Sequence, residues 1–241
     1  MRRSALLTGL VLTAVLAPLS IRADALSDVR AGLEKLSTAS PVKARVVISR
    51  QETEKEKPKG PEKKGEAVVE HGASGLSIHL EPAQLPTAGT QAERRKQEET
   101  TARLDPQTAM ELVDPAASIR LLIDGATLVS DRPEAFDGKP VRTVVFRPVP
   151  DMDEEDRKSV KRYEDVVTLR LDADGVPVAL DRTLDVKISK MLISFTVSQK
   201  ESRRFVRASG RLLTSSATEE SNGSGLGQSG GSRTRWTVTP L

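Results

Sequence analysis

The sequence contains no cysteine and very few aromatic residues. Without cysteine, disulfides, thiolate metal sites and lipid attachment to a cysteine side chain are excluded. One Trp, one Tyr and four Phe form the whole aromatic set, whereas a transmembrane β-barrel typically carries two aromatic girdles. The fold must therefore be held by an ordinary aliphatic core.

An excess of charge of one sign is also missing. The formal net charge is +3, and three of the basic residues, Arg2, Arg3 and Arg22, lie in the first 25 positions with a single acid, Asp24. The remainder is nearly neutral and has no basic stripe backed by aromatics. Nucleic acid is therefore not an expected partner.

The first 25 residues have the pattern of a secretory signal. Arg2 and Arg3 precede an apolar run from Ala5 to Leu19, and Ala23-Asp24-Ala25 has the small-x-small pattern of a cleavage site. The run is shorter than the roughly 20 residues needed to cross a bilayer, which disfavours the alternative of a retained anchor. We expect cleavage after Ala25, a periplasmic location or further secretion, and no integral membrane segment in the processed chain.

Residues 26–241 are enough for one large β-domain or two small ones, and we expect one. Apolar residues at three- and four-residue steps from Leu26 to Leu36 predict a helix, and the period changes to two at 42–49, which predicts a strand. Asp105-Pro106 and Asp114-Pro115 each supply an N-cap followed by proline, so two short helices are expected there.

Three hairpins can be registered by placing their apolar residues on one face. A turn over 72–75 sets His71 opposite Leu76 and Val69 opposite Ile78. A turn over 172–175 joins Val167, Leu169 and Leu171 to Val176, Val178 and Leu180. A turn at Ser189-Lys190 sets Ile188 opposite Met191, Val186 opposite Ile193 and Leu184 opposite Phe195.

Three segments are predicted to be flexible polar loops because they lack an apolar pattern: 52–64, 91–101 and 221–232. Residues 203–214 and 233–239 are predicted to complete the strands. The order of elements predicts an α+β fold in which a curved antiparallel sheet, an incomplete β-barrel, is covered by an N-terminal helix and by a helical insertion acting as a lid.

The order of these parts resembles the periplasmic outer-membrane lipoprotein carriers (LolA-like) of the lipoprotein-sorting superfamily. The resemblance rests on residues 25–50, on the strand-turn element 65–82, on the helix-strand-hairpin section 114–148, and on the strand pair 166–182 with its Asp-x-x-Gly-x-Pro turn. Fewer aromatics and longer polar loops depart from the family pattern.

This resemblance implies an apolar cavity that sequesters acyl chains of a lipid or lipoprotein, without a cofactor. The expected cavity residues are inward aliphatic and aromatic positions, each of which has a packed core as its alternative reading: Val46, Ile48, Val69, Ile78, Leu80, Val144, Phe146, Leu169, Val178, Val186, Ile193 and Phe195.

No catalytic or metal site is expected. The chain's two histidines, His71 and His79, fall on opposite sides of their hairpin, and the acidic run 151–156 fits a solvated loop better than a calcium site. The sequence offers no nucleophile with a base, so a hydrolase, for which Ser74 beside His71 would be the candidate, is the weakest alternative. The main alternative to a lipid carrier is a non-catalytic module that binds another envelope protein.

Overall fold

The computed structural model describes residues 25–36, 40–54, 57–80, 91, 101–150, 152–190 and 193–241. The expected signal segment, apart from Ala25, and most of the expected loop 91–101 lie outside these residues. Of that loop, Thr101 forms an isolated bridge with Lys64.

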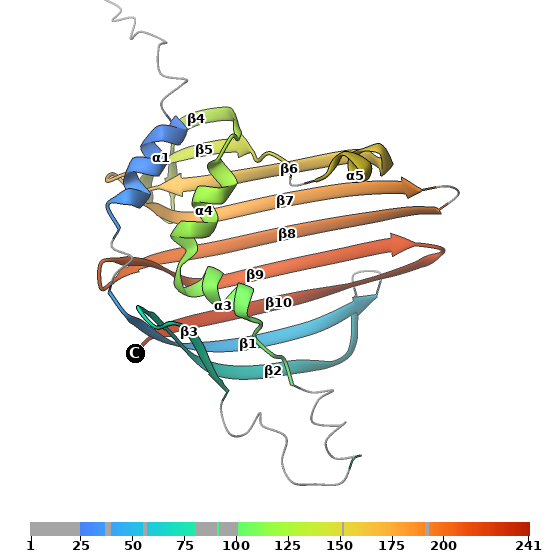
Figure 1. Ribbon diagram of the computed structural model, residues 1–241, viewed down its shortest axis with the longest axis horizontal. Helices are drawn as coiled ribbons and strands as arrows, with labels where there is room; N and C mark the ends of the chain where they lie inside the picture. Colours follow the sequence, from blue (N-terminus) through green and yellow to red (C-terminus); the bar gives the residue numbers. More distant parts are fainter. Residues whose placement is uncertain are drawn as a thin grey trace, which may run out of the picture.

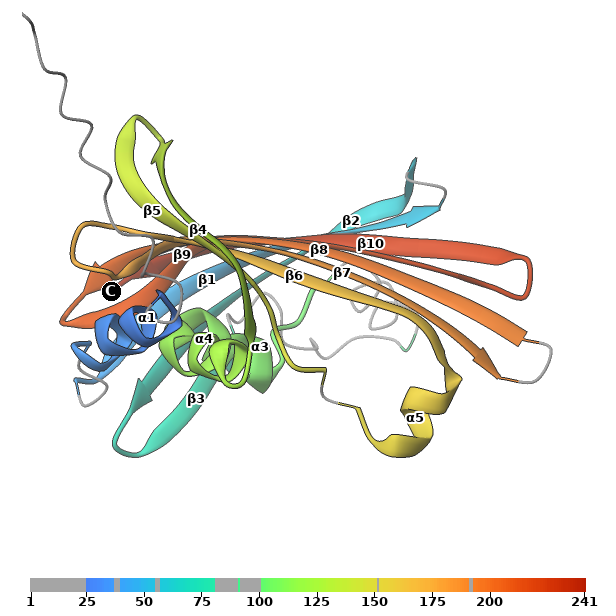
Figure 2. The same cartoon turned by 90° about the horizontal axis from the view of Figure 1, so that it is seen from above.

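The chain forms one ten-stranded antiparallel sheet in the order β3-β2-β1-β10-β9-β8-β7-β6-β5-β4. The first and last strands of the chain, β1 and β10, pair along Ala44–Thr53. The sheet is strongly twisted and does not close, because β3 and β4 are its edges (Figures 1 and 2). The expectation of a curved antiparallel sheet is confirmed. The strands are β1 Val42–Glu54, β2 Lys57–Gly72, β3 Gly75–Leu80, β4 Thr127–Phe136, β5 Lys139–Arg147, β6 Val160–Leu171, β7 Pro177–Lys190, β8 Ile193–Ala208, β9 Arg211–Gly225 and β10 Gln228–Pro240.

In the described part of the chain, four helices lie on one face of this sheet, which we call the inner face (Figure 2). They are α1 Ala25–Glu34, α3 Pro106–Val113, α4 Pro115–Ile123 and the short α5 Glu154–Ser159. Asp105 caps α3 by accepting a hydrogen bond from the Thr108 amide, as its Asp-Pro pair predicts. Asp114 precedes α4 without such a side-chain bond, and Gly125 with φ +66° follows the end of that helix.

Two packed clusters fill the space between the helices and the sheet. One joins α1 and α4 to β5, β6 and β7 around Phe146, Leu169 and Leu33. The other joins α3 to β1, β2, β9 and β10 around Val46, Val69 and Leu112, and these six side chains are all at most 2% exposed. The helices therefore seal one end of the inner face, whereas the other half of the strands extends past α3 and α4 (Figure 1).

One of the three predicted hairpin registers is confirmed. His71 pairs with Leu76 and Val69 with Ile78, as expected. In the second hairpin Leu169 pairs with Leu180, not with Val178, because an irregularity next to Arg170 inserts an extra residue into β7. The predicted register of that hairpin was therefore wrong.

The third hairpin turns two residues later than predicted. Lys190 pairs with Ile193 and Ile188 with Phe195, so the strands continue through Ser189 and Lys190. The shift keeps the same residues on the same face, because it moves the turn by an even number of positions.

Two segments predicted as loops are in fact strands. The described parts of 52–64 belong to β1 and β2, which pair there through Glu52–Lys59 and Glu54–Lys57. Likewise 221–232 contains the ends of β9 and β10, which pair from Ser221 with Ser232 down to their turn. Residues 203–214 were predicted as one strand, but they span the turn between β8 and β9 at Ser209-Gly210. The acidic run 151–156 was expected to be a solvated loop, but its last three residues begin α5.

A close contact between α1 and the β6–β7 turn depends on Gly32. A Cβ atom at Gly32 would lie 2.2 Å from the carbonyl oxygen of Gly175. Glycine is normally unfavourable in a helix interior, by about 1 kcal/mol relative to alanine. The contact explains its presence in a helix that must lie directly on a turn.

We expect Gly32→Ala to destabilise the protein by about 1–3 kcal/mol despite the better helix propensity of alanine, because α1 must move off the turn. Chemical denaturation of the variant measures this difference. Ser27→Ala, at an exposed position of the same helix, is the control and should be neutral or slightly stabilising. A stabilised Gly32→Ala variant would contradict the close packing.

Candidate functional site

The candidate site is the part of the inner face that the helices leave open. Directly paired residues on neighbouring strands point to the same face of the sheet, so strand pairing shows which side chains face this open part. Leu180, which belongs to the core under α4, pairs with Arg203, and Arg203 pairs with Ala217. Because side chains alternate along a strand, the inner residues of β7 beyond Leu180 are Arg182, Leu184, Val186 and Ile188. Val186 and Ile188 pair with Val197 and Phe195 on β8.

These four paired residues form an apolar strip on the inner face. Ile188, Val197 and Phe195 are 36%, 39% and 43% exposed. The ring of Phe195 lies against Gly225 of β9, where a Cβ atom would come within 2.3 Å of it. Exposed apolar side chains grouped on one surface are typical of a binding site rather than of an ordinary surface.

An apolar cavity of about 450 Å³ lies between the core and this strip. Its floor is the sheet, through Leu180, Leu184 and Phe205. One wall is α4, and the opposite wall is the segment after β5, which carries Pro148 and Val149. Leu121 of α4 and Val149 are 78% and 55% exposed, so both walls present aliphatic side chains to the opening. We call this cavity together with the apolar strip the inner groove.

A buried ion pair stabilises the floor of the cavity. Arg182 donates two hydrogen bonds to Asp165, at 2.9 and 2.7 Å, and the Asp165 side chain is only 1% exposed. Tyr163 also donates to Asp165, and burial together with the neighbouring carboxylate raises the pKa of Tyr163. Because the partners satisfy each other, this group is a fixed polar edge beside the apolar side chains of Leu180, Leu184 and Phe205.

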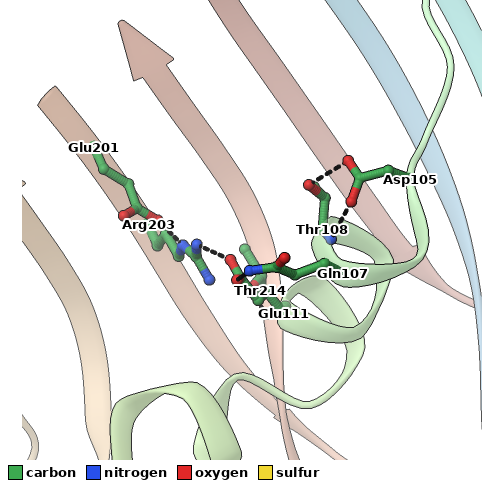
Figure 3. A network of polar contacts seen from close by, with 7 residues as sticks. All are labelled: Asp105, Gln107, Thr108, Glu111, Glu201, Arg203 and Thr214. Atoms are coloured by element: carbon green, nitrogen blue, oxygen red, sulfur yellow. Dashed lines mark hydrogen bonds and ion pairs between the residues drawn. The ribbon is translucent and has the colours of Figure 1, made fainter. Parts of the chain in front are cut away.

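A second ionic group marks the end of the groove at α3. Arg203 of β8 donates to Glu111 of α3 at 2.5 Å and forms an ion pair with Glu201 on its own strand (Figure 3). Thr214 of β9 donates to the Glu111 carbonyl oxygen. These contacts tie the last turn of α3 to the sheet. Figure 3 shows Asp105 and Thr108 at the opposite end of the same helix.

A polar cavity of about 880 Å³ lies on the other side of this ionic group. It is open to the inner face above β1, β9 and β10 and includes Trp236 on its floor. Glu219 of β9 lines it, and burial, together with the charges of Glu201 and Glu111, raises the pKa of Glu219. The apolar groove and the polar cavity are thus neighbours on one face.

The structure places eleven of the twelve predicted cavity residues in four environments. Six lie in the packed clusters beneath the helices and are at most 2% exposed: Val46, Ile48, Val69, Val144, Phe146 and Leu169. Ile78 and Leu80 pack partly buried on the edge of the second cluster. Val178 is half-buried at the register irregularity in β7. Val186 and Phe195 belong to the inner groove, and Ile48 also lines the polar cavity. Ile193 begins β8 and pairs with Lys190.

The walls of the groove were not predicted from the sequence. Leu121 and Val149 do not belong to an apolar pattern shared with neighbouring residues. From the sequence alone, Leu121 is therefore expected on a helix surface and Val149 at the end of a strand. The signal that identifies them is their large exposed aliphatic surface next to a cavity. Leu184 was recognised only as a member of the third hairpin.

The residues considered for hydrolytic chemistry lie at the β2–β3 hairpin. Ser74 lies exposed in the turn between β2 and β3, and His71 is half-buried on β2. Among the described residues, no group of three His, Cys, Asp or Glu side chains has an arrangement suited to a metal ion.

Comparison of the chain with protein-family models, with curated proteins and with solved structures gives no match. No helix in the part of the chain that the structure describes combines the length and apolar character needed to cross a membrane.

Glu219→Gln tests the electrostatics between the two cavities. A carboxyl with a raised pKa binds its proton more tightly in the folded protein than in the unfolded chain. Its contribution to the stability of the folded state is fully present below the unfolded pKa of about 4.3 and is lost as the pH rises through the folded-state pKa. We therefore expect Glu219→Gln to be more stable than the wild type at pH 7, by roughly 0.5–1 kcal/mol, with no gain at pH 3. Denaturant unfolding at both pH values measures this.

The adjacent Glu220 is the matched control, because it lies on the outer face and forms an ion pair with Arg233 at 2.6 Å. Glu220→Gln should show no gain in stability at pH 7. An unchanged or less stable Glu219→Gln variant at pH 7 would show that Glu219 is not destabilised by its neighbours.

Proposed function

We propose that the protein is a non-catalytic acyl-chain binding or carrier protein that holds the apolar part of a lipid or lipoprotein in the inner groove. The observation that supports this most is the apolar cavity between α4 and the segment after β5, which continues into exposed apolar side chains on β7 and β8. Its volume of about 450 Å³ falls within the range of small-molecule sites.

The driving force is removal of apolar surface from water. Burial of each methylene contributes about 0.8 kcal/mol, and the ligand would also cover Leu121, Val149 and Leu184. The fixed Arg182–Asp165 pair offers no unsatisfied charge toward a hydrocarbon chain. An alkyl chain is therefore a better match for this groove than a polar metabolite.

The resemblance to the LolA-like carriers points in the same direction. It implies a curved sheet whose inner face holds acyl chains under a helical lid, and in this proposal α3 and α4 are that lid. In this proposal the protein acts in the periplasm, which the secretory pattern of the first 25 residues supports.

Two charge substitutions in the groove test the proposal. Leu184→Asp places a carboxylate on the cavity floor, and Val197→Asp places one on the apolar strip. Each should weaken the binding of a fluorescent fatty acid by at least about tenfold, because an ion would have to be desolvated against the alkyl chain. Fluorescence titration of the purified chain measures the affinities.

Val206→Asp is a matched control. Val206 lies on the same strand as Val197 and is 39% exposed, as Val197 is, but it faces the outer side of the sheet. Its substitution should leave the affinity unchanged. Wild-type binding by Leu184→Asp and Val197→Asp, or loss of binding in all three variants alike, would contradict the groove as the binding site.

A second candidate is a module that binds an envelope protein. The exposure of Ile188, Val197 and Phe195, which project beyond the cavity, favours a contact with another surface. The two candidates differ in what the purified protein carries. Copurified lipid detected by mass spectrometry supports the carrier, whereas a lipid-free chain that ignores fluorescent fatty acids supports the interaction module.

A further inference from the structure

The inner groove and the polar cavity meet at the boundary between β8 and β9. Glu201, which lines the groove, pairs directly with Glu219, which lines the polar cavity, and paired strands lie about 4.8 Å apart. Helix α3 borders both spaces, with Asp105 at the polar end and Glu111 at the apolar end. Six residues of helix span about 9 Å, so one amphiphilic molecule can reach both cavities.

Several charged groups in the polar cavity already have hydrogen-bond partners. Lys63 binds Glu52 at 2.9 Å, and Asp105 accepts hydrogen bonds from the amide and the hydroxyl of Thr108 at 2.9 and 2.7 Å. The cations left are Arg50 and Arg103, which form no hydrogen bond or ion pair within the described part of the chain. Both line the cavity.

In the described part of the chain, two guanidinium groups of one cavity form no hydrogen bond, and their free donors favour an anionic ligand. A guanidinium binds phosphate through two parallel hydrogen bonds, and a phosphate monoester carries a charge of about −1.5 to −2 at pH 7. Hydroxyl groups of Ser221, Ser232 and Thr234 add donors to the same lining. The cavity also contains the carboxyl of Glu219, whose pKa is raised by burial and by Glu201 and Glu111, and lowered by Arg203 and Arg50.

We propose that the two cavities form one site for an amphiphile with a phosphate headgroup, its alkyl chain in the inner groove and its phosphate between Arg50 and Arg103. This inference rests on the proposed function and names the ligand class for it. The chain lies across β6, β7 and β8, and the headgroup lies over β9, β10 and β1. The ionic group of Arg203, Glu111 and Glu201 marks the boundary between the two halves of the ligand.

Displacement of a bound fluorescent fatty acid tests this inference. The competitors are dodecyl phosphate, dodecanol, dodecyltrimethylammonium and inorganic phosphate, all below their micellar concentrations. Dodecyl phosphate should displace the probe at about tenfold lower concentration than either other dodecyl compound, because only its headgroup forms charge-assisted hydrogen bonds. Inorganic phosphate should not displace the probe, since it lacks the chain.

The double variant Arg50→Gln with Arg103→Gln should lose this preference while its response to dodecanol stays unchanged. Arg235→Gln, on the outer face of β10, is the control and should keep the preference. Equal displacement by all three dodecyl compounds, or a preference that survives the double variant, overturns the headgroup assignment but leaves acyl binding intact. A wild-type chain that binds no fluorescent fatty acid overturns the proposed function and this inference together.

Discussion

The structure depends on covering the inner face of a curved sheet that does not close. Apolar side chains line this face from Val69 on β2 to Phe146 on β5, and exposing them would cost roughly 25 cal/mol for each Å². Helices α1, α3 and α4 cover them at one end, where the core is packed and dry. The strands are longer than these helices can cover, and the groove lies where the cover ends.

The fold was predictable where the sequence presents two distinct faces. The register of the β2–β3 hairpin follows from Val69 and Ile78, because an odd shift would expose both. The third hairpin was misplaced because moving its turn by two residues keeps Ile188 and Phe195 on the same face, so the apolar pattern cannot distinguish the two registers. Segments 52–64 and 221–232 were missed as strands because both of their faces are polar, and pairing with neighbouring strands orders them.

The candidate site was less predictable than the fold, since a sequence pattern does not separate a filled core from a cavity. Leu169 and Leu184 have the same periodicity, yet the first is sealed beneath the helices and the second lines an opening. The bond between Arg203 and Glu111 joins residues 92 positions apart, and this contact determines where α3 ends on the sheet. Contacts between residues so far apart in the sequence arise only from the tertiary fold.

In the proposed function, an alkyl chain lies on the inner face beside α4. Photo-crosslinking with a fatty acid that carries a diazirine, followed by peptide mass spectrometry, tests this position most directly. We expect adducts on α4 near Leu121, on the segment at Val149 and on β7 near Leu184. Adducts restricted to the outer face, for example at Val206, or none at all would contradict it.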